Sequence, residues 1–478
     1  MTTPTTAILG IDLGATEVKA GLVGLDGRLL AIARAGYGLD VGRGPGWAEQ
    51  DPGAWWSAVR IAVRSLRPPE PADVVAIGVD GHGPTLAPID DQGEATRPSI
   101  TFLDTRAIAE ASELAEATDI RGWALGPLPA ALWLERNEPD VAARTRWYLA
   151  TWEWLAFRLT GVAAAPLVPG QAIPDPSHVA TTGLRLGRRP DTIALGAVVG
   201  ILTAPAAESL GLQPGIPVAG GTNDAFASYL GAGLLQAGDA YDPGGSAGGF
   251  GVYWHEPIEV PGAFVTPAPL EGLFSVGAAM AATGRALDWF RDGVVGGGVT
   301  TEQLLEEAGT TPPGADGLVF LPYLAGERSP IWDPGATGAF VGLTLVHGRA
   351  HLARAILEAS ALAIRHVAEP MLAAGVTVAA MRVCGGPARS ETWNQIKADV
   401  TGFPVLVPAV LETAVLGSAM LGAVAIGACP DVPAAERSMT RIERRLEPRR
   451  EYRVVYDRAF EVYRGLYPAL RPLLAAPG

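Results

Sequence analysis

The chain has little of three things that often identify a partner or a compartment: cysteine, lysine and net positive charge. It contains only Cys384 and Cys429, too few for a disulfide framework, so we expect a reducing, cytoplasmic location. Lysine occurs only as Lys19 and Lys397, and arginine supplies the remaining cationic side chains. The net charge of −14 leaves no general basic surface, which argues against nucleic acid or an anionic membrane as a partner.

A targeting or membrane-spanning segment is also not apparent. Residues 1–6 show neither the basic start nor the apolar core of a signal peptide. Residues 413–429 are apolar and uncharged, but the run is short and holds three glycines among small residues. This pattern predicts a buried, closely packed helix in preference to a membrane span.

What the chain does contain is ample material for folded cores. Hydrophobic residues make up 48% and charged residues 18%, which excludes a disordered chain. A length of 478 residues predicts about two large domains. Sixty glycines and forty prolines indicate many tight turns, as strand-rich α/β proteins with short connections require.

The most informative local pattern covers residues 8–23. It predicts an apolar strand, a tight turn holding Gly14 and Thr16, and a second strand in a hairpin. Asp12, Thr16 and Lys19 then surround a turn with free backbone N–H groups. The carboxylate can hold Mg²⁺ through water, while the hydroxyl, amine and N–H groups face phosphate oxygens. Judged from this segment alone, the alternative to a phosphate-binding turn is an ordinary glycine-turn hairpin.

Further elements follow along the chain. We expect a third antiparallel strand at 28–33 and a continuous, buried strand at 74–79. Asp51 and Pro52 predict the cap and first turn of a helix to about residue 66. Other helices are expected at 107–117, 128–138, 225–233, 350–374 and 392–401.

A second glycine-rich hairpin, at residues 240–253, resembles the first in form. It again places an acidic residue before a turn of small residues and an apolar strand after it. Two such hairpins suggest a structural duplication with its boundary near 238–243. We therefore expect domains at 1–240 and 241–478.

Asp224 follows a short strand and two glycines and precedes a helix. Phosphoryl transfer needs phosphates held in line and one residue that orients and deprotonates the attacking hydroxyl, and Asp224 suits that role. The alternative is a helix N-cap, which Asn223 or Thr222 could equally supply.

Three segments together resemble the FGGY carbohydrate kinases, most closely the xylulokinase-like branch. They are residues 12–16, residues 220–225, and residues 384–390 continuing to 402, and the resemblance extends from about residue 8 to residue 427. It implies an α/β fold of two actin-like (ribonuclease-H-like) ATPase domains flanking a central cleft. The N-terminal domain would bind the sugar and carry the first phosphate turn and the catalytic aspartate, and the C-terminal domain would bind the nucleotide.

The resemblance also implies cofactors and site residues. ATP and Mg²⁺ would be the cofactors, Asp224 the general base, and Asp12 the residue that holds the metal. The implied nucleotide-binding residues are Asp12, Gly14, Thr16, Lys19, Gly245, Ser246, Gly284, Gly385, Gly386 and Pro387.

On the sugar side, the resemblance points to Asp80, His82, Asp104 and Arg106. The alternative for His82 is a loop histidine whose side chain is hydrogen-bonded to the backbone. The alternative for Asp104 and Arg106 is a salt-bridged pair on the surface. Gly81 stands where the family has methionine and Phe102 where it has tryptophan, so we expect a sugar pocket of different shape.

The predicted function is ATP-dependent phosphorylation of a hydroxyl on a small sugar or sugar alcohol, with a pentulose such as xylulose preferred. The alternatives are an actin- or chaperone-like ATPase and a non-catalytic, sugar-binding relative of the kinases. The expected partners are the small-molecule sugar and, as a candidate, a second copy of the chain in a homodimer, with neither nucleic acid nor membrane.

Overall fold

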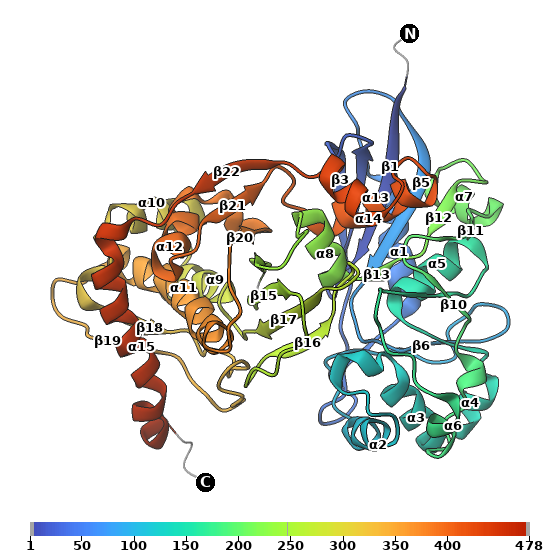
Figure 1. Ribbon diagram of the computed structural model, residues 1–478, viewed down its shortest axis with the longest axis horizontal. Coiled ribbons are helices and arrows are strands. Elements are labelled where there is room, and N and C mark those ends of the chain that lie inside the picture. Colours follow the sequence, from blue (N-terminus) through green and yellow to red (C-terminus); the bar gives the residue numbers. More distant parts are fainter. Residues whose placement is uncertain (1–3, 246, 475–478) are drawn as a thin grey trace. The chain divides into compact units, whose positions relative to one another are not determined.

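The structure, a computed structural model, describes residues 4–245 and 247–474 (Figure 1). It consists of two compact α/β units, and each unit is assembled from separate segments of the chain. Unit 1 combines the residues up to 233 with 267–272 and 412–440. Unit 2 combines 234–266, 273–411 and the residues from 441 onward.

Unit 1 is built on a mixed sheet that opens with the three antiparallel strands expected from the sequence. Its strands are β1 (Thr5–Leu13), β2 (Glu17–Gly24), β3 (Leu29–Gly36), β5 (Ala72–Gly81), β11 (Val198–Ile201), β12 (Pro217–Ala219) and β13 (Thr222–Asn223). The order is β11-β12-β5-β1-β2-β3, with β13 also pairing with β5. β5 runs parallel to both β1 and β12, which confirms the buried strand predicted there.

Helices and short strand pairs complete the N-terminal part of unit 1. The helices are α1 (Pro52–Arg64), α2 (Ile108–Thr118), α3 (Leu128–Asn137), α4 (Pro139–Arg144), α5 (Thr151–Thr160), α6 (Pro176–Ala180), α7 (Ala204–Leu210) and α8 (Asp224–Ala232). The short pairs are β4 (Glu49–Gln50) with β7 (Ser99–Ile100), β6 (Ala87–Ile89) with β8 (Trp147–Leu149), and β9 (Ala165–Leu167) with β10 (Thr192–Ala194). α1 begins as predicted, because the Asp51 carboxylate accepts the Gly53 N–H at 2.8 Å.

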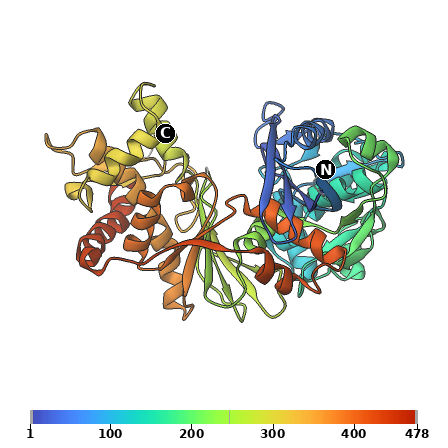
Figure 2. The same cartoon turned by 90° about the horizontal axis from the view of Figure 1, so that it is seen from above.

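Two helices from late in the chain belong to unit 1, namely α13 (Thr413–Ala425) and α14 (Val432–Met439). α13 contacts β1, β5 and α8, and Figure 2 shows this orange segment against the blue strands. The approach depends on glycine, because a Cβ on Gly78 would lie 1.7 Å from the Ser418 carbonyl oxygen. α13 is buried as predicted, and none of the described helices is long and apolar enough to cross a membrane.

Unit 2 has a sheet ordered β16-β17-β15-β14-β20-β21-β22. These strands are β14 (Asp239–Asp242), β15 (Gly249–Trp254), β16 (Phe264–Pro267), β17 (Phe274–Ala279), β20 (Ala380–Val383), β21 (Val405–Pro408) and β22 (Ile442–Leu446). β14 pairs antiparallel with β15 and parallel with β20, just as β1 pairs with β2 and with β5. The two units therefore repeat one local topology, as the two hairpin patterns suggested.

The remaining elements of unit 2 form its helical layers and its core. They are α9 (Arg285–Trp289), α10 (Thr301–Thr310), α11 (Arg349–Ala373), α12 (Glu391–Thr401), α15 (Arg453–Leu474), and the pair β18 (Val319–Leu321) with β19 (Ala339–Val341). α11 packs against α12 and α10, and its middle is fully buried. Each unit has its own hydrophobic core.

Candidate functional site

Four predicted site residues meet in unit 1, at the ends of strands β1 and β5 and the start of α8. Asp12 lies opposite Lys19 on β2 and beside Asp80 on β5. Thr222 pairs with Asp80, so the short strand β13 leads directly into Asp224 at the first position of α8. We call Asp12, Lys19, Asp80 and Asp224 the Asp12 cluster. The sheet register thus brings together residues that are up to 212 positions apart in sequence.

Asp12 has one oxygen engaged and one available. Its Oδ2 accepts from Lys19 Nζ at 3.2 Å, whereas its buried Oδ1 has no donor among the described residues. Burial alone would lower the pKa of Lys19, but the negative charges of Asp12 and Glu412 outweigh it and raise that pKa. Within the described part of the chain, no three His, Cys, Asp or Glu side chains are placed so that they alone could hold a metal ion. An available carboxylate oxygen of this kind fits Mg²⁺, which commonly uses one or two carboxylates with water and phosphate oxygens.

Asp80 is fully buried beside Asp12. Its Oδ2 accepts from the Ser418 hydroxyl of α13 at 2.5 Å. Burial raises the pKa of Asp80 well above its usual range, and the negative charge of Asp12 adds to that rise. These effects favour the neutral carboxyl at Asp80. Ser418 of α13 and Asp12 of β1 are thus polar neighbours of Asp80, which precedes His82 by two residues at the end of β5.

Asp224 is half-buried and is not the cap of its helix. The Asn223 side chain caps α8 by accepting the Phe226 N–H at 2.8 Å. Burial, followed by the negative charge of Asp12, raises the pKa of Asp224 to about 7, against the opposing effects of the Ala225 N–H and Lys19. Because Asn223 is the N-cap of α8, the alternative interpretation of Asp224 as a helix N-cap does not apply.

The turn that carries Gly14 and Thr16 is held from one side by side chains. The Tyr37 hydroxyl donates to the Gly14 carbonyl, and Gln50 Nε2 donates to the Ala15 carbonyl at 2.8 Å. Within the described residues, no acceptor takes the backbone N–H of Gly14, Ala15 or Thr16. A turn whose carbonyls are anchored and whose N–H groups are free can receive an anion.

His82 lies at the end of β5 in an aromatic environment. Its ring packs edge-to-face on Trp55 with centroids 5.5 Å apart, and only 1% of the residue is exposed. Nδ1 bonds the Thr85 hydroxyl at 3.1 Å, and that hydroxyl accepts the Phe102 N–H at 3.2 Å. Nε2 is buried without a partner among the described residues. Burial lowers the pKa of His82 to about 3, so its ring is neutral at physiological pH.

Asp104 and Arg106 form a buried network and are not the surface pair considered as an alternative. The Asp104 carboxylate accepts from the Ala48 N–H at 2.6 Å and from the Arg106 backbone and guanidinium at 2.5–2.9 Å. Arg106 also bonds Glu49 at 2.8 Å and stacks on Trp47 at 3.7 Å. Both Asp104 oxygens are therefore used internally, while the buried Nη1 of Arg106 remains without an acceptor among the described residues.

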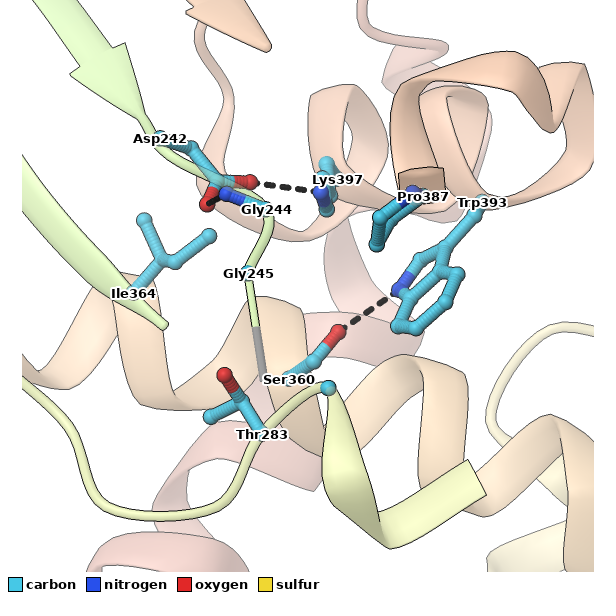
Figure 3. A pocket seen from close by; sticks show the side chains of 10 residues that line it. Asp242, Gly244, Gly245, Thr283, Ser360, Ile364, Pro387, Trp393 and Lys397 are labelled. Atoms are coloured by element: carbon cyan, nitrogen blue, oxygen red, sulfur yellow. Dashed lines mark hydrogen bonds and ion pairs between the residues drawn. The ribbon is translucent and has the colours of Figure 1, made fainter. Parts of the chain in front are cut away.

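Unit 2 contains a pocket at the glycine turn that follows β14 (Figure 3). Its lining residues are Asp242, Gly244, Gly245, Thr283, Gly284, Ser360, Ile364, Pro387, Trp393 and Lys397. Gly244 has a φ of +58°, and a Cβ there would lie 2.2 Å from the Cys384 carbonyl oxygen, so the turn after β14 closely approaches the turn after β20. This close approach requires glycine at position 244.

The pocket brings together three of the predicted nucleotide residues, namely Gly245, Gly284 and Pro387. Gly385 and Gly386 precede Pro387 in the same turn, where a Cβ on Gly386 would meet nothing within 4 Å. Ser246 lies outside the described residues. Asp12, Gly14, Thr16 and Lys19 belong to unit 1.

The site contains residues that the sequence reasoning did not select. They are Tyr37, Glu412 and Ser418 around the Asp12 cluster, and Asp242, Thr283, Ser360, Trp393 and Lys397 in the pocket of unit 2. The rarity of lysine could have pointed to Lys397, because it is one of only two lysines in the chain. Glu412 and Ser418 reach the cluster only through the folding of α13 onto unit 1.

Comparison with known proteins gives a consistent result. Models of the FGGY family of carbohydrate kinases match residues 7–231 with the N-terminal domain and 245–426 with the C-terminal domain. A xylulose kinase of Escherichia coli (strain K12) is 32% identical over 82% of this chain and 84% of its own length. A gluconokinase of Bacillus licheniformis is 26% identical over 86% of this chain and 85% of its own length. The crystal structure of xylulose kinase from Rhodospirillum rubrum is similar with a TM-score of 0.80 and 31% identity, covering 98% of this chain and 99% of that one.

Proposed function

Because this chain belongs to the FGGY family of carbohydrate kinases, and is thus a carbohydrate kinase that uses ATP with Mg²⁺, we propose that it phosphorylates a pentulose such as xylulose. The proposal of a pentulose rests on two xylulose kinases, which are 32% and 31% identical to this chain. The gluconokinase relative makes an aldonate the second candidate.

We assign the general base to Asp224, and its surroundings are the observation that carries this assignment. A base that acts near neutral pH works best when its pKa lies close to the pH of the reaction. Burial and Asp12 raise the pKa of Asp224 to about 7. In the proposed step, an Asp224 oxygen accepts the proton of the substrate hydroxyl as that hydroxyl attacks the γ-phosphorus of ATP and ADP leaves.

We assign phosphate recognition to backbone N–H groups and a few charged side chains. In unit 1 these are the free N–H groups of Gly14, Ala15 and Thr16, with Lys19 near Asp12. In unit 2 they are the glycines of the pocket that includes Gly245 and Gly284. Mg²⁺, when bound, neutralises phosphate charge, and Asp12 Oδ1 is the atom we assign to hold it, directly or through water.

We assign sugar recognition to His82 and Arg106. Each has a buried polar nitrogen without a partner among the described residues, namely Nε2 of His82 and Nη1 of Arg106. The Thr85 hydroxyl accepts the Phe102 N–H and can donate its own proton to His82 Nδ1, which leaves the ring proton on Nε2. Both atoms are then donors suited to oxygen atoms of a sugar. Asp104 acts here through Arg106, which it holds in place.

A substrate screen tests the proposal directly. The full chain would be incubated with MgATP and a panel of pentuloses, hexuloses, pentitols, gluconate and glycerol, and ADP release would be measured. NMR of the product would then locate the phosphate. We expect the highest kcat/KM for a pentulose, whereas a clear preference for gluconate would contradict the pentulose and favour the second candidate.

A further inference from the structure

One of the two lysines of the chain, Lys397, lies inside the unit 2 pocket. It projects from α12, and its side chain is only 3% exposed. Its Nζ bonds Asp242 Oδ2 at 2.5 Å, and the Asp242 side chain is 4% exposed (Figure 3). All other lining residues of this pocket are uncharged. The pocket wall therefore carries one buried ion pair, contributed by positions 155 residues apart.

Asp242 links this ion pair to the glycine turn. While Oδ2 bonds Lys397, Oδ1 accepts the Gly244 backbone N–H at 2.9 Å. The Asp242 backbone carbonyl also accepts the Cys384 N–H at 3.2 Å, which ties the turn to the one after β20. One aspartate thus fixes the path of the residues that lead to Gly245.

Lys397 is itself held in place by its neighbours on the pocket wall. Its Nζ lies 5.4 Å from the centre of the Trp393 ring, on the same helix. Trp393 Nε1 in turn donates to the Ser360 hydroxyl of α11 at 2.7 Å. The ammonium group therefore has a defined position between an aromatic face and a carboxylate.

A carboxylate at this turn is unfavourable for phosphate binding unless its charge is neutralised. Phosphate oxygens are negative, and a buried, unpaired carboxylate near them would repel them strongly in a medium of low dielectric constant. Lys397 removes this repulsion, while Asp242 still holds the Gly244 N–H.

We propose that Lys397 is a positioning residue for the nucleotide, because it neutralises Asp242 and so lets an acidic side chain organise the phosphate turn. This inference rests on the proposed assignment of the unit 2 pocket to ATP. It assigns a function to the Lys397–Asp242 pair that goes beyond holding unit 2 together.

The test compares the two ways of breaking the same ion pair. MgADP affinity of the full chain would be measured by isothermal titration calorimetry for Lys397→Gln, Asp242→Asn and the double variant. Lys397→Gln leaves an unpaired carboxylate at the turn, so we expect about tenfold weaker binding, equivalent to about 1.4 kcal/mol. Asp242→Asn keeps an oxygen for the Gly244 N–H and removes the negative charge, so we expect affinity within about threefold of the unaltered chain. The double variant should also bind within about threefold, and the pentulose KM of Lys397→Gln should change less than about twofold.

A matched control separates the proposal from a loss of stability. Arg354 and Glu358 form another buried ion pair in unit 2, at 2.7 Å and with both side chains 4% exposed, and neither lines the pocket. Arg354→Gln should lower the Tm but leave MgADP affinity unchanged. The proposal would be overturned if Lys397→Gln and Asp242→Asn weakened MgADP binding equally, or if the double variant bound MgADP no more tightly than Lys397→Gln. If Lys397→Gln does not fold, weak binding by the double variant would overturn it.

The calorimetric readout also keeps this proposal distinct from the proposed substrate. A chain that binds MgADP but phosphorylates no pentulose would contradict the substrate and leave the comparison of variants intact. A chain that does not bind MgADP would overturn the role of Lys397.

Discussion

At the scale of single residues, Asp224 shows how two charged neighbours can adjust one carboxyl group. Asp12 and burial disfavour its ionised form, whereas Lys19 and the Ala225 N–H favour it. The balance places the pKa of Asp224 near 7, about three units above that of a solvated aspartate. Such a carboxylate is a stronger base than usual and is still ionised at slightly alkaline pH.

The first prediction follows from this pKa. Asp224 must be ionised to accept a proton, so kcat/KM should be constant above about pH 8 and fall about tenfold per pH unit below about pH 6. Replacing Asp224 with Asn should lower kcat by about 10²–10⁴-fold while MgADP affinity stays within about threefold. Steady-state kinetics from pH 5 to pH 9 and calorimetry check both parts. Near-normal turnover by Asp224→Asn would remove this residue from the mechanism.

His82 gives a second prediction at the same scale. His82→Ala removes a buried hydrogen-bond donor. We expect the pentulose KM to rise about tenfold, because this is the usual effect of losing one to two hydrogen bonds. The KM for MgATP should be nearly unchanged. Because burial lowers the pKa of His82 to about 3, this effect should be the same at pH 6 and pH 8.

His82→Gln and His82→Asn provide the comparison for this experiment. A Gln amide reaches toward the position of Nε2, whereas an Asn amide reaches only toward Nδ1, so Gln should retain more sugar affinity than Asn. An unchanged pentulose KM in His82→Ala would show that the histidine has only a packing role.

At the scale of elements, local chemistry was sufficient to predict several boundaries. The Asp51 cap with Pro52, the hairpin around Gly14 and the start of α8 at Asp224 each depend on a few adjacent residues, and the structure confirms them. The apolar run that became α13 predicted burial correctly but carried no information on its partner. Its packing on β5 depends on Gly78 and Ser418, which are 340 positions apart and show no shared local pattern. For the same reason, the pairing of Lys397 with Asp242 was not predictable.

The third prediction concerns the contact between α13 and α8. A Cβ on Gly417 would lie 1.9 Å from the Ala227 carbonyl oxygen, so the two helices can approach only if that position has no side chain. Gly417→Ala should therefore lower stability by about 1–3 kcal/mol, the usual effect of overpacking a core. Gly465→Ala in α15 is the control, because a Cβ there meets nothing within 4 Å. The control should raise stability by about 0.5–1 kcal/mol through helix propensity, and equal Tm changes in both variants would contradict the argument.

At the scale of the whole molecule, the main finding is that unit 1 is discontinuous. The sequence suggested a linear division near residue 240, because both hairpin patterns begin a new run of elements. The structure adds residues 412–440 to unit 1, where they cover β1 and β5. Sequence patterns can predict where a domain begins. They do not show that a later segment returns to an earlier domain, because the sequence of such a segment looks like that of any other buried helix. Only the contacts between α13 and the first sheet identify its place.

The last prediction tests this discontinuity. A fragment of residues 1–240 lacks α13, and the faces of β1, β5 and α8 that α13 covers would be exposed. We expect this fragment to aggregate or to bind a hydrophobic dye without a cooperative thermal transition. A Cβ on Gly231 would lie 1.8 Å from the Thr413 carbonyl oxygen, so the last turn of α8 lies close to the start of α13. A second fragment can therefore join residues 1–234 to 412–440 through about four flexible residues. This second fragment should unfold cooperatively, because it restores the missing helix to the same sheet. Cooperative unfolding of residues 1–240 alone would show instead that α13 is dispensable for unit 1.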